Sequence, residues 1–230
     1  MKKSLVNRHG DRNFDKEYFS PRYKKYDKKE FIKTYRSLVA WIRFIERYFP
    51  VRNIAEKKVL EVGCGLGGFA KILEEKGCNV SASDISAFMI ENAKKLNPNV
   101  KFSVVNIELD AEKYKDNEYD IIFAFEVMEH LVNPQKALQN LKRKLKKNGL
   151  LIFTTPYRTK RTTSDPTHIS VQEPEVWVRI GKRLGFRDLQ FKYATFIPFF
   201  YRYSSIFSIA LPIRTDLPII GYTCFFSFRK

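Results

Sequence analysis

Short apolar runs alternate with amphipathic segments along most of the chain. Between about residues 28 and 48, apolar side chains from Phe31 to Ile45 recur at helical spacing, and Pro50 ends that segment. Strand-type runs then alternate with helix-type segments that have capping or breaking residues at their ends. The predicted strands span residues 59–62, 79–83, 100–104, 119–125 and 150–155, and the predicted helices span 68–77, 86–96 and 134–147. This alternation predicts a parallel sheet covered by helices on both faces.

The C-terminal part departs from this alternation of strands and helices. A helix is predicted over residues 175–184 and a sixth strand over 186–193, but no helix-length segment directly precedes the seventh strand at 222–229. Without a crossover helix, the last two strands are expected to pair antiparallel. The pattern therefore predicts an α/β fold with a seven-stranded, mostly parallel sheet and an antiparallel edge strand.

The first predicted strand runs directly into a glycine-rich turn that opens a helix. Its glycines, Gly63-x-Gly65-x-x-Gly68, fit the spacing of a dinucleotide-binding turn, in which backbone N–H groups approach a ligand closely. Two further features alter this interpretation: Glu61 precedes the first glycine by two residues, and Gly67 extends the string to Glu-x-Gly-x-Gly-x-Gly.

With the strand before it, this string resembles motif I of the class I S-adenosylmethionine (SAM) methyltransferases, and the resemblance covers roughly residue 14 to the C-terminus. It implies a Rossmann-like fold with SAM as cofactor. In that family the acidic residue and the glycines serve the methionine end of the cofactor, which here implicates Glu61, Gly63, Gly65 and Gly67.

Further cofactor-binding residues are expected where the next strands end. Asp84 follows the second strand, where a carboxylate can accept hydrogen bonds from both hydroxyls of a ribose. The alternative role for Asp84 is to cap the following helix, which Ser86 can already do. Ile85 is expected to cover the adenine. Many relatives have an acidic residue after the third strand, whereas this chain has Asn106 and Ile107. The adenine is therefore expected to contact the Asn106 side-chain carbonyl or the Ile107 backbone. Phe125 is the last residue of the predicted cofactor-binding set.

The fourth strand leads into Glu126-Val-Met-Glu129-His130. Spacings of three and four place these three polar side chains on one face of a helical turn, at the edge of the sheet where open α/β sheets bind ligands. His168, in the loop after the fifth strand, returns to the same edge. Together they form either a general base with its orienting carboxylate, the ligands of one divalent ion, or a set that merely shapes the pocket.

This set resembles the Glu-x-x-Glu-His motif with a distant histidine that binds magnesium in small-RNA 2′-O-methyltransferases. It also resembles the corresponding stretch of the ubiquinone-pathway O-methyltransferases, so the resemblance alone does not identify a substrate. It implies Glu126, Glu129, His130 and His168 as metal ligands. For a hydroxyl acceptor, His130 or His168 is the candidate catalytic residue that lowers the effective pKa of the oxygen.

Composition limits the classes of function and the domain organisation. At 230 residues the chain is expected to form one methyltransferase domain over residues 51–230, preceded by a basic helical extension over residues 1–50. The net charge of +17 favours polyanionic partners such as RNA, anionic lipid surfaces or acidic metabolites. Three cysteines without motif spacing, and no apolar segment of signal or membrane-spanning type, predict a cytoplasmic protein.

An insertion at about residues 196–213 is too apolar for an ordinary surface loop. It is expected to act as a lid on the substrate pocket, with contact to a membrane interface and stacking on RNA as the alternatives. The sequence thus predicts a SAM-dependent methyltransferase for a small, apolar or lipid-linked acceptor, methylated at oxygen. The alternatives are an RNA 2′-O-methyltransferase and, with less support, a nicotinamide-dependent oxidoreductase.

Overall fold

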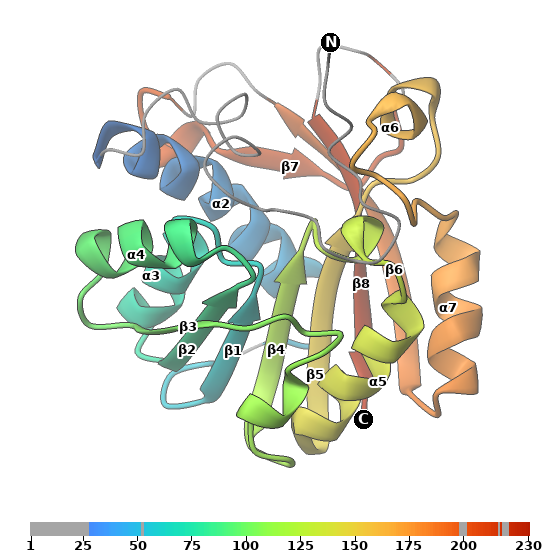
Figure 1. Cartoon of the computed structure of the whole chain (residues 1–230). Helices are drawn as coiled ribbons and strands as arrows, with labels where there is room; N and C mark the ends of the chain where they lie inside the picture. Colours follow the sequence, from blue (N-terminus) through green and yellow to red (C-terminus); the bar gives the residue numbers. More distant parts are fainter. Residues whose placement is uncertain (1–27, 52, 198–201, 216, 218–220) are drawn as a thin grey trace, which may run out of the picture.

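The computed structural model describes residues 28–51, 53–197, 202–215, 217 and 221–230. Within these residues the strands form one eight-stranded sheet in the order β3-β2-β1-β4-β5-β8-β6-β7. Figure 1 shows helices on both sides of this sheet. The predicted α/β class, the mostly parallel sheet and its antiparallel end are confirmed, with one strand more than the sequence predicted.

The parallel half of the sheet is built around the glycine-loop strand. Strand β1 (Lys58–Val62) lies between β2 (Asn79–Asp84) and β4 (Tyr119–Phe125), and it is parallel to both. Strand β3 (Lys101–Val104) pairs with β2, and β5 (Leu145–Thr155) pairs with β4, again in parallel. The carboxyl ends of these strands therefore meet at one edge of the sheet, where the polar motifs of the sequence were expected.

Two apolar cores occupy the two faces of the sheet, because alternate side chains of each strand point to opposite sides. Along β5, Leu150 and Ile152 enter one core, while Leu151 and Phe153 enter the other. The first core is shared with three helices, and the second with two. The helices of the first core are α2 (Lys28–Tyr48), α3 (Gly68–Glu75) and α4 (Ala87–Leu96), and those of the second are α5 (Pro134–Lys144) and α7 (Pro174–Arg183).

Helix α2 confirms the amphipathic segment predicted from the sequence. Ile42, Phe44 and Ile45 are buried against the sheet, and Trp41 stacks on Phe196 with ring centroids 5.2 Å apart. The rest of the basic extension, residues 1–27, lies outside the described residues. No helix in the described ranges is long and apolar enough to cross a lipid bilayer.

The C-terminal strands differ in part from the prediction. Strand β8 (Gly221–Arg229) lies between β5 and β6 (Arg187–Ile197) and is antiparallel to both, so the expected antiparallel pairing is confirmed. The insertion adds the extra strand: β7 (Ile209–Leu211) pairs with the end of β6 and forms the edge of the sheet.

The boundary between α5 and β5 was predicted three to five residues too late. The helix ends at Lys144, and β5 begins at Leu145 rather than at Leu150. Leu145 is fully buried and pairs with Tyr119, so burial draws it into the sheet, and the Asn148-Gly149 turn signal falls within the register shift of the ladder. The helical turn expected at Glu126 is also shorter, because the 3₁₀ helix η2 spans only Met128–His130.

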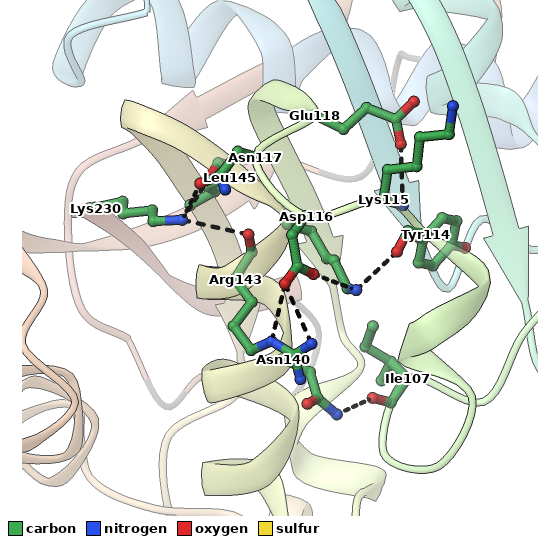
Figure 2. A network of polar contacts seen from close by, with 11 residues as sticks. Ile107, Tyr114, Lys115, Asp116, Asn117, Glu118, Asn140, Arg143, Leu145 and Lys230 are labelled. Carbon is green, nitrogen blue, oxygen red and sulfur yellow. Dashed lines mark hydrogen bonds and ion pairs between the residues drawn. The ribbon is translucent and has the colours of Figure 1, made fainter.

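A polar network closes the opposite edge of the sheet from the site (Figure 2). Lys144 is 2% exposed, and its Nζ donates hydrogen bonds to the Tyr114 carbonyl at 2.7 Å and to Asp116 at 2.6 Å. The Nζ of Lys230 donates to the Leu145 carbonyl at 2.7 Å. Because these contacts satisfy a buried ammonium and join α5 to the strand ends, they fix the scaffold that positions the opposite edge.

Candidate functional site

The glycine loop adopts a conformation that side chains would disturb. Gly67 stands at φ +78° as the N-cap of α3, and Gly63 at φ +74° directly follows β1. A Cβ on Gly63 would come within 2.3 Å of the Val127 side chain, so no larger residue fits there without displacement of that side chain. Asn97 donates its side-chain amide to the carbonyls of Leu66 at 3.3 Å and Gly67 at 3.4 Å. This second support of the loop was not predicted from the sequence.

Asp84 ties the loop to the end of the neighbouring strand. Its two carboxylate oxygens accept from the backbone N–H of Gly65 and of Ser86, both at 2.9 Å. Ser86 caps α4 by accepting from the Met89 N–H, so Asp84 is not needed as the helix cap. Burial raises the pKa of Asp84, against the opposing effect of the backbone hydrogen bonds. The carboxylate keeps lone pairs for a ribose, which is the role that the sequence predicted.

Glu61 lies beneath the same loop and is 4% exposed. Its Oε2 has no hydrogen-bond partner among the residues that the structure describes. The pKa of Glu61 is raised to about 8, mainly by burial, with a smaller contribution from the nearby Asp84 and an opposing effect of a hydrogen bond from the Ala70 backbone. A buried carboxylate with an unpaired oxygen gains from a cationic partner. Glu61 therefore fits the ammonium group of an amino-acid moiety held over the loop.

The residues predicted for the adenine lie around the same edge. Ile85 is 37% exposed and presents an apolar surface. The Asn106 side-chain oxygen accepts from the Glu108 N–H at 2.9 Å, and the Ile107 carbonyl accepts from the Asn140 amide at 2.8 Å, as Figure 2 shows for the latter. These contacts hold the turn after β3, a role not expected from the sequence. Phe125 packs edge-on against Trp41 and Phe69, which places it at the wall of the first core.

Glu126 lies outside the group of potential metal ligands that the structure brings together. Its backbone has φ +52°, a left-handed conformation that is uncommon outside glycine, so it does not share the turn of Glu129 and His130. Its Oε1 accepts from the hydroxyls of Thr154 at 2.8 Å and Thr223 at 2.7 Å. The predicted four-residue set is therefore three residues, with Glu126 in the wall of the same pocket.

Glu129, His130 and His168 each place one ligand atom within 4.8 Å of the others. Backbone hydrogen bonds bring the distant histidine there, because the N–H groups of Ile169 and Ser170 both donate to the Glu129 carbonyl at 2.9 Å. The Glu129 side chain is fully buried, and the two imidazole rings have centroids 4.9 Å apart. The sequence prediction that the loop after β5 returns to this edge agrees with the geometry.

Backbone carbonyls fix how both imidazoles present their nitrogens. The Nδ1 of His130 lies 3.0 Å from the Thr167 carbonyl, and the Nδ1 of His168 lies 3.0 Å from the Thr162 carbonyl. Since a carbonyl only accepts, each Nδ1 carries a proton, and Nε2 is the nitrogen that can act as an acceptor. This arrangement is the one that orients histidine for metal binding or for taking up a proton.

A pocket of about 280 Å³ opens beside these residues. Its lining combines acidic, imidazole and guanidinium groups, from Glu126, Glu129, His130, Arg161, Thr162, Asp165 and His168. Arg161 and Thr162 belong to the short helix α6 (Lys160–Ser164), which was not predicted from the sequence. The sequence signal for Asp165 was its position three residues before His168. Its carboxylate lies 3.8 Å from the His168 Nε2.

The known proteins that this chain resembles include methyltransferases. The chain matches curated ubiquinone biosynthesis O-methyltransferases, among them one from Rickettsia akari with 36% identity over 112 residues and one from Rickettsia bellii with 33% identity over 111 residues. The matched regions cover 48% and 47% of this chain and 44% and 46% of those relatives. The chain thus spans about half the length of the curated relatives it matches.

Solved structures share the fold at low sequence identity. A SAM-dependent methyltransferase from Archaeoglobus fulgidus superimposes with a TM-score of 0.65 at 18% identity, covering 93% of this chain and 99% of that one. A SAM-dependent methyltransferase from Thermotoga maritima, described as a possible histamine N-methyltransferase, gives 0.64 at 19% identity over 93% and 97% of the two chains. These similarities establish the fold.

The model of the methyltransferase domain family matches residues 32–191, which is well over half of the chain. The match begins in α2 and includes the glycine loop, Asp84, the η2 turn and His168. This protein belongs to the methyltransferase domain family, and the resemblance to the class I SAM-dependent methyltransferases is confirmed.

Proposed function

We propose that this protein transfers a methyl group from SAM to a hydroxyl oxygen of a small, apolar acceptor. The observation that carries the proposal is the position of two oriented imidazoles and a buried carboxylate beside the edge of the sheet that holds the glycine loop. The relatives from Rickettsia are named for O-methylation in ubiquinone biosynthesis, which supports an oxygen acceptor and an apolar one.

The chain's own residues fit the cofactor at both of its ends. Glu61, with its unpaired buried oxygen, suits the ammonium group, and Asp84 suits the ribose hydroxyls. When bound, SAM would supply an electrophilic methyl group on a sulfonium; the C–S electron pair would pass to sulfur as the acceptor oxygen formed its bond to the methyl carbon. Positioning and exclusion of water are the main contributions of the protein to such a displacement.

The hydroxyl proton of the acceptor needs a destination as the oxygen is methylated. The Nε2 of His130 or of His168 can take it, because both rings already carry their proton on Nδ1. The Glu129 carboxylate, 3.8 Å from the His130 Nε2, stabilises the imidazolium that results. Glu126, held by two threonine hydroxyls, provides a fixed acceptor in the pocket wall for a second polar group of the substrate.

The same three residues also fit a divalent ion. Two imidazole Nε2 atoms and one carboxylate are ligands that zinc, manganese or iron accept, and the carbonyls behind each Nδ1–H are the usual outer partners of such histidines. A bound ion would supply a positive charge that lowers the pKa of an acceptor hydroxyl. Glu129, His130 and His168 would then hold the ion instead of accepting the proton.

Two other functions receive less support. The nicotinamide oxidoreductase rested on glycine spacing alone, and the family match does not favour it. The RNA 2′-O-methyltransferase rests on the net charge of +17 and on the histidine motif. Neither feature requires RNA, because the pocket of about 280 Å³ suits a small group and the charge serves any polyanionic partner.

Cofactor binding is the first expected outcome. Wild-type protein should bind SAM and its demethylated product in calorimetry and should not bind NAD. Asp84→Asn removes an acceptor from both the ribose and the Gly65 N–H, so affinity for SAM should fall by about 1–3 kcal/mol, or roughly five- to 150-fold. Asp188→Asn, at a 62% exposed side chain, is the control and should bind as the wild type does. Affinity for NAD without affinity for SAM would exclude the proposal.

The affinity for SAM should depend on pH through Glu61. The pKa of Glu61 is about 8 in the free protein, so the carboxyl is largely neutral below that pH and ionises as pH rises through it. A cationic ammonium favours the ionised form, so SAM affinity should rise with pH up to about pH 8 and then level. Folding raises the pKa of Glu61 from 4.5 to about 8. The folding stability of the free protein that is present at low pH should therefore decrease as the pH rises toward 8. Glu61→Gln should flatten both profiles, and an unchanged slope in that variant would assign the dependence to another group.

The acceptor class can be tested with SAM labelled in the methyl group. Alkylated phenols should be methylated at oxygen, with KM falling as the alkyl chain lengthens and with little effect of salt. RNA oligonucleotides should not be methylated. Methyl transfer to RNA, with binding that weakens steeply as salt is raised, would replace the small-molecule acceptor by RNA.

Metal dependence separates the two roles of the histidine pair. If an ion is bound, the purified protein should contain it by mass spectrometry, chelator should abolish methyl transfer, and a divalent ion should restore it. His130→Ala and His168→Ala should each lose the ion, whereas His9→Ala, at the remaining histidine of the sequence, should retain it. Should the chelated wild type keep full activity while His130→Ala loses it, the pair acts as a base and not as a metal site.

A further inference from the structure

The edge strand β7 carries apolar side chains toward solvent. Alternation along the strand turns Ala210 inward, where it packs against the first core, and turns Ile209 and Leu211 outward. Ile213, just after the strand, is exposed as well. These three side chains are 45%, 40% and 51% exposed. Edge strands normally carry charged residues on such positions, because exposed apolar edges aggregate. An outward apolar face here therefore indicates a surface with a partner.

The turn that precedes β7 extends this surface. The 3₁₀ helix η3 (Ser205–Phe207) exposes Ile206 at 72% and Phe207 at 49%, and Tyr203 just before it is 78% exposed. Together with the strand positions they form what we term the apolar patch, which consists of Tyr203, Ile206, Phe207, Ile209, Leu211 and Ile213. Half of the exposed large apolar side chains in the described residues lie in this patch.

Helix α2 holds the patch in one conformation. Arg43 donates from Nη1 to the Ser205 carbonyl at 2.9 Å, and Arg36 donates from Nη1 to the Arg202 carbonyl at 2.6 Å. Ser208 is 3% exposed, accepts from the Ala40 N–H at 3.1 Å and donates to the Ser37 carbonyl at 3.1 Å. The apolar side chains are thus presented on a fixed support, which reduces the entropy lost when a partner covers them.

The charges around the patch select the partner. From Tyr193 to Thr215 the sequence contains no acidic residue, while Arg202 and Arg214 lie exposed within that stretch. The whole chain carries a net charge of +17. Asp216 is the next acid along the chain. Apolar and tyrosine side chains flanked by exposed arginines match the interface of an anionic bilayer, in which the apolar groups enter the acyl boundary and the arginines meet headgroup phosphates.

We propose that the apolar patch docks this protein on the surface of an anionic lipid bilayer. In Figure 1, β7 lies on the side of the molecule toward which the arrowhead of β4 points, so docking would bring the carboxyl edge of the sheet near the bilayer. The inference about the surface stands without the proposed acceptor. If the acceptor is apolar, docking would let it reach the pocket from the bilayer.

Vesicle sedimentation with the full chain tests the proposal. Wild type should bind vesicles that contain phosphatidylglycerol, bind vesicles of pure phosphatidylcholine weakly, and lose part of the binding at high salt. The double variant Ile206→Ser/Ile209→Ser should partition about tenfold less or weaker still, because two apolar side chains no longer enter the interface. The matched control Leu109→Ser/Val132→Ser changes two apolar side chains that are 67% and 63% exposed elsewhere, and it should bind as the wild type does.

Two further measurements keep the outcome decisive. Thermal melting and SAM calorimetry should be unchanged in the patch variant, which separates loss of docking from loss of fold or of cofactor binding. Wild-type binding by the patch variant, or equal loss in both double variants, would overturn the proposal. The proposal would also be overturned if light scattering showed a concentration-dependent dimer, and if Ile206→Ser/Ile209→Ser abolished that dimer while vesicle binding persisted. The patch would then be an interface between two copies.

Discussion

The carboxylate of Asp84 is the contact on which the rest of the site depends. It accepts one hydrogen bond from the Gly65 N–H and another from the Ser86 N–H, so it couples the loop after β1 to the start of α4. Gly63 and Cys64 also donate to the Ser83 carbonyl, at 2.8 and 2.9 Å, which anchors the loop on β2. Because β1 is paired in parallel with both β2 and β4, a loop fixed in this way sits at a defined distance from the ends of both neighbours. The residues proposed for the cofactor and the histidine pocket therefore belong to one edge of the sheet.

Two pairs of acids share that edge and suit different roles. Glu61 and Asp84 lie under the glycine loop, where burial raises the pKa of both carboxyls and makes cationic or hydroxyl partners favourable. Glu126 and Glu129 lie at the other side, held by threonine hydroxyls in one case and placed beside two imidazoles in the other. The first pair suits recognition of a cofactor, and the second pair suits positioning of an acceptor and removal of its proton. This division follows from the neighbours of each acid and not from residue type.

The C-terminal antiparallel strands complete the site and connect it to the surface. Strand β8 supplies Thr223 to the Glu126 carboxylate, and β6 continues into the segment that bears the apolar patch. Arginines of α2 hold that segment from the other side. The insertion thus belongs structurally to the sheet and to α2. Its described residues do not line the pocket beside the histidines, so its predicted role as a lid stays a prediction.

Local pattern was enough to predict most of the architecture, because period, capping residues and glycine spacing act over a few residues. The first four strands, the glycine loop, the Ser86 cap and the place of Asp84 at a strand end were all predicted in this way.

Contacts between distant residues decided the rest. Leu145 entered the sheet because burial outweighed the Asn148-Gly149 turn signal, and Glu126 left the helical turn because two threonines from β5 and β8 hold its carboxylate. Likewise the Nδ1 protons of His130 and His168 are fixed by carbonyls of residues 167 and 162, and the outward face of β7 depends on its pairing with β6. A sequence predicts which side chains reach an edge, whereas only the folded chain determines which of them meet, because that depends on hydrogen-bond partners far apart in sequence.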